Sequence, residues 1–171
     1  IQLGATVNFT RGLVSGNREM GILLSDQDTS LELIESIVRD TKVALCAEDP
    51  ALTCPYAVGQ GFGDGILVVG GAQLELEDFE ITDNARAGLI LFDTSNADFG
   101  DIWGAPTLEV LRGTITGNQY GIHFREGNIT PADFAGKELA CYDNASTIDG
   151  CYSEVELEVP SPSEALEGLT R

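Results

Sequence analysis

The stretch LELEDFEITDNARAGLIL, residues 74–91, contains the pattern that decides the fold. Apolar residues alternate with polar ones, a polar turn ends in Asn, and a Gly precedes a second apolar run. The pattern recurs three more times, with its turn residues at Asn17, Thr41, Asn84 and Asn118, which are 24, 43 and 34 residues apart. A unit this short cannot bury its own apolar side, so the copies must stack. The repeat therefore predicts a solenoid with a basic coil of 24 residues.

Two insertions interrupt this period, because the longer spacings exceed 24 by 19 and 10 residues. The first extends from about Cys46 to Phe62 and the second from about Thr94 to Thr107. Variable loops on a regular scaffold are where solenoids usually carry their binding surfaces.

Within each coil the pattern predicts two short strands joined by the polar turn. Stacked coils then form parallel sheets in which equivalent residues repeat about every 4.8 Å. Asn17, Asn84 and Asn118 would stack at one corner and pass hydrogen bonds from amide to amide. The glycines that follow the turn are expected to adopt a positive φ at a bend; they are Gly21, Gly65, Gly88 and Gly121.

The Asn-containing turn followed by Gly-Ile/Leu-x-Leu/Phe resembles the right-handed parallel β-helix repeat proteins of the pectate-lyase-like superfamily. The resemblance covers about residues 6–124, with an expected extension to Val159, and implies an all-β, right-handed, single-stranded parallel β-helix of four to five coils. A single domain is expected over residues 1–171, with repeat coils at about 5–127. A cysteine-containing segment and a short C-terminal cap would follow, at about 128–171. The catalytic motifs of the family's hydrolases are missing, so no catalytic residue is assigned.

One part of the repeat is ambiguous. Residues 30–38 also place Ile34, Ile37 and Val38 at helical spacing behind a Ser cap. Alignment with the other copies favours a strand. Near the end of the chain, residues 155–159 read as a last strand, and Ser161-Pro162-Ser163-Glu164 predicts a short capping helix.

Composition limits the classes of partner. The formal net charge is −19, which argues against binding nucleic acid or an anionic membrane through basic side chains. No apolar run is long enough to span a membrane. The four cysteines form two local pairs, Cys46 with Cys54 and Cys141 with Cys151, and loops closed by disulfides indicate an oxidising, extracellular or cell-surface location. Zinc ligation is the rival interpretation of these thiols.

Three glutamates are expected to align on the outer face of the first strand. These residues, Glu32, Glu75 and Glu109, are called the acidic column here. Like charges about 5 Å apart repel, so the column is either a solvated, salt-screened face, the more ordinary case, or a site that recruits Ca²⁺.

The outer face of the second strand is expected to carry an apolar column of Leu23, Leu67, Ile90 and His123. Apolar side chains of this kind mark contact surfaces. Either an insertion covers them, such as the loop that contains Phe99 and Trp103, or a partner does. His123 is the only imidazole, and no nucleophile or orienting carboxylate is assigned beside it.

These observations favour a non-catalytic binding or structural module for a glycan or protein partner. The alternative is a calcium-dependent, polysaccharide lyase-like enzyme in which Arg112 or Arg125 takes the proton, as the family resemblance implies. N-x-S/T sequences at Asn8, Asn128 and Asn144 are formal glycosylation acceptors, and the sequence alone gives no reason to regard them as more than chance matches.

Overall fold

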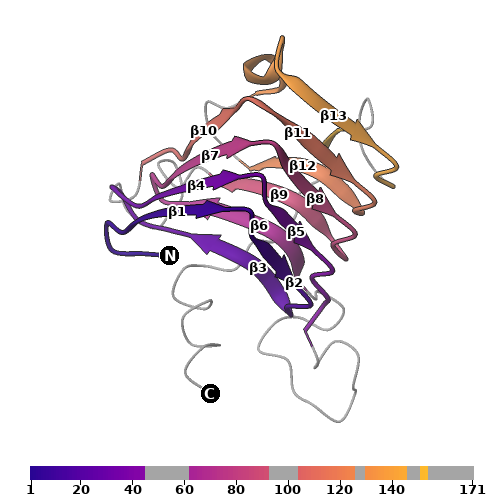
Figure 1. Ribbon diagram of the computed structural model, residues 1–171, viewed down its shortest axis with the longest axis horizontal. Helices are drawn as coiled ribbons and strands as arrows, with labels where there is room; N and C mark the ends of the chain where they lie inside the picture. The colour runs from indigo at the N-terminus through magenta and orange to yellow at the C-terminus, as the bar shows by residue number, and fades with distance from the viewer. Residues whose placement is uncertain (45–61, 93–103, 126–129, 146–150, 154–171) are drawn as a thin grey trace.

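The computed structural model describes residues 1–44, 62–92, 104–125, 130–145 and 151–153. The chain forms stacked coils of parallel strands, as expected for a parallel β-helix (Figure 1). The strands of the first two coils are β1 (Thr6–Thr10), β2 (Leu13–Ser15), β3 (Glu19–Leu24), β4 (Ser30–Ile34), β5 (Ile37–Arg39) and β6 (Gly63–Val69). The next two coils contain β7 (Gln73–Glu77), β8 (Phe79–Thr82), β9 (Ala87–Phe92), β10 (Thr107–Val110), β11 (Arg112–Thr116) and β12 (Tyr120–Arg125).

Three parallel sheets result from this stacking. The first sheet has the order β1-β4-β7-β10. The second has the order β13-β11-β8-β5-β2 and the third β14-β12-β9-β6-β3, where β13 is Glu138–Tyr142 and β14 is Tyr152–Ser153. The repeat alignment is confirmed residue by residue, because Leu31 pairs with Leu74, and Leu74 with Leu108.

Each of the first four coils contains three strands, whereas two were predicted. The predicted first strand breaks into two at a corner where Arg11, Glu35 and Asp78 have φ values of 55°, 50° and 50°. A left-handed residue turns the chain there, and no glycine marks the position. The same break settles the ambiguity at residues 30–38, which form the strands β4 and β5 on either side of Glu35 and no helix.

A second corner holds an asparagine ladder, as predicted for Asn84 and Asn118, whereas Thr41 occupies the ladder position between Asn17 and Asn84. Asn84 donates from its backbone and its side chain to Oδ1 of Asn118, at 2.9 and 3.0 Å. Asn118 donates in the same way to Oδ1 of Asn144, at 3.2 and 3.1 Å, so the ladder extends one coil further than the sequence alignment did. Thr41 donates its backbone N–H to Asn84 Oδ1 at 3.1 Å.

The prediction of positive φ for the repeated glycines is wrong. None of Gly21, Gly65, Gly88 and Gly121 has a positive φ, and the left-handed residue lies just before the ladder, as at Asp40 and Asp83. The glycines are required for space instead. A Cβ on Gly88 would lie 2.9 Å from the carbonyl oxygen of Gly121 and 3.0 Å from Nδ2 of Asn118. The glycine column thus makes room for the asparagine ladder.

The core lies between the three sheets and consists mainly of the inward residues of their strands, such as Leu76, Ile81 and Leu89, each fully buried. The 3-10 helix η1 (Pro131–Phe134) takes the place of a first-sheet strand in the fifth coil and buries Phe134. The rings of Phe124, Phe134 and Tyr152 lie 5.7–5.9 Å apart and close this end of the core.

The disulfide between Cys141 and Cys151 is confirmed, and it joins the second sheet to the third in the fifth coil. The insertions enter between β5 and β6 and between β9 and β10. Their residues 45–61 and 93–103, which include Cys46, Cys54, Phe99 and Trp103, lie outside the described residues, as do the predicted last strand and capping helix.

Candidate functional site

The outer face of the first sheet carries two rows of polar side chains in register. One row is the acidic column together with Asn8, since Asn8 pairs with Glu32, Glu32 with Glu75, and Glu75 with Glu109. The neighbouring row is formed by four polar residues of the same strands: Thr6, Ser30, Gln73 and Thr107. The predicted alignment of the three glutamates is therefore correct.

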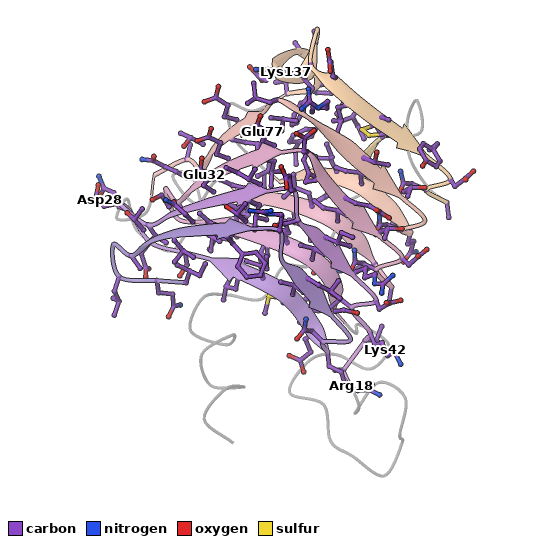
Figure 2. All side chains as sticks on the ribbon, in the orientation of Figure 1. Arg18, Asp28, Glu32, Lys42, Glu77 and Lys137 are labelled. Carbon is purple, nitrogen blue, oxygen red and sulfur yellow. A yellow bond between two sulfur atoms is a disulfide. The ribbon has the colours of Figure 1, made fainter. Side chains whose placement is uncertain are left out.

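These rows line a groove of about 450 Å³ that crosses four coils, called the first-sheet groove here. Strand alternation explains the lining, because Leu31, Leu74 and Leu108 point to the core side while their polar neighbours face outward. Glu32 and Glu75 are half-buried and Glu109 is exposed. Glu77, the next outward residue of β7, extends the acidic surface toward the corner (Figure 2).

Local hydrogen bonds order one end of the groove. Ser30 Oγ donates to Thr6 Oγ1 at 3.1 Å. With its amide nitrogen turned toward the column, Asn8 donates to Glu32 Oε2 at 3.2 Å. Asn8 thus supplies a donor in the coil where the column has no carboxylate.

In the part of the chain that the structure describes, no three His, Cys, Asp or Glu side chains are grouped closely enough to hold a metal ion. Stacking separates the carboxylates of the column by one coil each, about 4.8 Å between strands. Calcium binding at the column stays a prediction, and it would require two neighbouring carboxylates to close on one ion with water or ligand oxygens completing the shell.

The apolar column lies on the outer face of the third sheet, where Leu23, Leu67, Ile90 and His123 stack in register. Leu67, Ile90 and His123 are 1%, 0% and 2% exposed, while Leu23 is half-buried. Since this burial occurs within one chain, a partner could reach Leu67 and Ile90 only by displacing residues of the same chain. Phe99 and Trp103 of the predicted contact surface lie outside the described residues.

A buried ion pair, which the sequence analysis did not identify, lies on the same outer face. Arg86 donates from two guanidinium nitrogens to the carboxylate of Asp64, and the Ala87 N–H donates to Asp64 Oδ1 at 3.1 Å. The Arg86 guanidinium lies 4.6 Å from the ring centre of Phe62. Burial raises the pKa of Asp64, while the bonds from Arg86 and Ala87 oppose that rise. Asp64 lies directly before the repeated Gly65, and Arg86 lies two residues before Gly88 in the next coil. Opposite charges near the same repeat position of adjacent coils are the sequence signal that could have revealed this pair.

The arginine proposed as a proton acceptor is held in another role. Arg112 pairs with Asp78 at the corner between the first and second sheets, and its guanidinium lies 3.9 Å from Glu138. The Asp78 hydrogen bonds raise the pKa of Arg112, and the same pairing lowers the pKa of Asp78. Because this pairing favours the protonated form of Arg112, the guanidinium is poorly suited to accept a proton from a substrate. The side chain of Arg125 lies outside the described residues.

Comparisons with known proteins assign no family: no family model matches the chain, and no significantly similar characterised protein or solved structure was found. The site must therefore be interpreted from its own chemistry.

Proposed function

We propose that this protein is a non-catalytic β-helix module that binds an extended glycan in the first-sheet groove. The observation that carries the proposal is the groove itself, in which a polar row and the acidic column run in register across four coils. Regular rows of outward polar side chains suit a ligand that repeats along the solenoid axis. The assignment to the pectate-lyase-like superfamily is part of this proposal and rests on the repeat pattern.

The chemistry of the groove restricts the ligand to one rich in hydrogen-bond donors. Ionised carboxylates only accept hydrogen bonds, whereas Thr, Ser and Gln side chains both donate and accept. Sugar hydroxyls and protonated amino groups provide the required donors. A polyanionic chain would meet the acidic column and a net charge of −19, so a neutral or amino-sugar glycan fits better than a polyuronate.

One further observation supports an extracellular location. The Cys141–Cys151 disulfide is typical of oxidising compartments. Among the described residues, no helix is both long and apolar enough to cross a membrane. A module displayed outside the cell would encounter glycans at high local concentration.

The test is isothermal titration calorimetry with neutral, amino-sugar and polyuronate oligosaccharides, with and without Ca²⁺. The triple variant E32Q/E75Q/E109Q is compared with E80Q, which changes one exposed glutamate on the outer face of the second sheet. We expect a neutral or amino-sugar ligand to bind and the triple variant to weaken binding at least about tenfold, a loss of about 1.4 kcal/mol. E80Q should bind like the wild type.

Failure of all neutral and amino-sugar ligands to bind would refute the proposal, as would unchanged affinity in the triple variant. A lyase forms an unsaturated uronate product that absorbs in the ultraviolet. Detection of this product from a polyuronate in the presence of Ca²⁺ would refute the non-catalytic proposal in favour of the lyase alternative.

A further inference from the structure

The structure describes the asparagines of two of the three N-x-S/T sequences, and their environments differ. Asn8-Phe9-Thr10 lies in β1, and Asn144-Ala145-Ser146 begins at the asparagine ladder. Asn128 lies outside the described residues. An N-linked glycan is attached to the side-chain Nδ2 of Asn, so the surroundings of that atom determine whether the folded chain can carry one.

The Nδ2 of Asn144 is enclosed by the fold. It donates to the Ile115 carbonyl oxygen at 3.2 Å, while Oδ1 of the same side chain accepts two hydrogen bonds from Asn118. It also faces Gly121, whose added Cβ would lie 3.1 Å from it. A sugar on this nitrogen would break the last step of the ladder and collide with β12.

Asn8 has the opposite environment. Its side chain is exposed on the outer face of the first sheet, and β1 is the end strand of that sheet among the described strands. Thr10, whose hydroxyl completes the acceptor sequence, points to the same face two residues further on and is also exposed. The turned amide reaches two described acceptors, Oε2 of the half-buried Glu32 at 3.2 Å and the carbonyl oxygen of Val7 at 3.3 Å, while the side chain itself stays exposed.

From this difference we infer that Asn8 is an N-glycosylation site and that Asn144 is not. The inference does not rest on glycan binding in the first-sheet groove, but Asn8 lines one end of that groove, so an attached glycan would occupy that end. In the reaction, Nδ2 of Asn8 forms a bond to the anomeric carbon of a sugar and loses one proton. The anomeric carbon–oxygen bond of a lipid-linked sugar phosphate donor breaks, and the phosphate leaves with the electron pair. The Cys141–Cys151 disulfide is consistent with a secretory compartment, where such donors occur.

A glycan at Asn8 would have a physical consequence for the solenoid. End strands present unpaired backbone groups, and proteins commonly protect them from pairing with another chain. A bulky hydrophilic group on the outer face of β1 would hinder edge-to-edge association at this end of the first sheet.

The test is secretion of the full chain from a host with an oligosaccharyltransferase, followed by site-specific mass spectrometry of the secreted protein. The N128Q background removes the third acceptor. T10S keeps the Asn8 acceptor sequence and T10A removes it, and both variants leave Asn8 in place. Circular dichroism of each secreted protein verifies the fold.

We expect glycan at Asn8 in the N128Q parent and in T10S, no glycan at Asn8 in T10A, and no glycan at Asn144 in any of them. An unmodified Asn8 in both the parent and T10S would overturn the inference. Glycan at Asn144 in folded, secreted protein would overturn it as well.

Discussion

At the scale of single residues, Thr41 is the weak step of the asparagine ladder. Its backbone N–H is bonded to Asn84, but its Oγ1 is buried without a hydrogen-bond partner. We expect Thr41→Asn to stabilise the protein by about 1 kcal/mol, because an amide there can continue the ladder toward Asn17. Urea unfolding should show a higher midpoint with an unchanged slope. A lower midpoint would show that the first two coils cannot accept a further ladder amide.

The Asp64–Arg86 pair gives a second prediction at this scale. Arg86→Met leaves a fully buried carboxylate without its counter-ion, which costs about 3–5 kcal/mol at neutral pH. Removal of the guanidinium raises the pKa of Asp64 further. The folded state tolerates Asp64 in its protonated, neutral form. The difference in free energy of unfolding between the variant and the wild type therefore shrinks as the pH falls and grows as the pH rises through that pKa.

Chemical denaturation of Arg86→Met between pH 4 and 8, read as a difference from the wild type, measures this effect. The double variant Asp64→Leu/Arg86→Met serves as the control, and we expect it to recover most of the lost stability because neither charge remains buried. A deficit independent of pH and unrelieved in the double variant would mean that Arg86 acts through packing alone.

At the scale of elements, the repeated glycine sets how closely the third sheet approaches the ladder corner. Gly88→Ala should cost about 1–3 kcal/mol, because its Cβ would press on backbone and ladder atoms at 2.9–3.0 Å. Gly16→Asp is the matched control. Gly16 has a φ of 70° with open space around it, and Asp40 and Asp83 occupy the same corner position in later coils. In thermal unfolding, the melting temperature of Gly88→Ala should lie well below that of Gly16→Asp. Equal decreases in melting temperature for the two variants would contradict the steric explanation.

The elements also show what the sequence could and could not predict. The alternation around Leu74 and Leu108 predicted the register, because a slip of one residue would turn every apolar side chain outward. The extra corner was missed because its left-handed residues, Arg11, Glu35 and Asp78, share no residue type that would mark a repeated turn. The ladder residue Asn144 was missed because the cysteine loop obscures the repeat in the fifth coil.

At the scale of the whole molecule, the candidate site was partly predictable. The acidic column followed from the alignment alone, since its members occupy one repeat position. The polar row beside it follows from the same alignment, since its members lie two residues before the column in the same strands. The volume of the groove could not be predicted, because it depends on the positions of the side chains in space. Cover of Leu67 and Ile90 by the same chain was one of the two alternatives that the sequence left open, and their burial agrees with it.

The charge of the whole molecule gives the last prediction. A net charge of −19 on a stacked fold produces repulsion that salt screens, so NaCl should raise the melting temperature up to ordinary ionic strength. At constant ionic strength, equal shifts with Ca²⁺ and Mg²⁺ would show that these cations only screen the acidic surface. Differential scanning fluorimetry against a chelator control measures both effects. A shift specific to Ca²⁺ that grows with the logarithm of its concentration would instead identify a native-state site, and its loss in E32Q/E75Q/E109Q would locate that site in the acidic column.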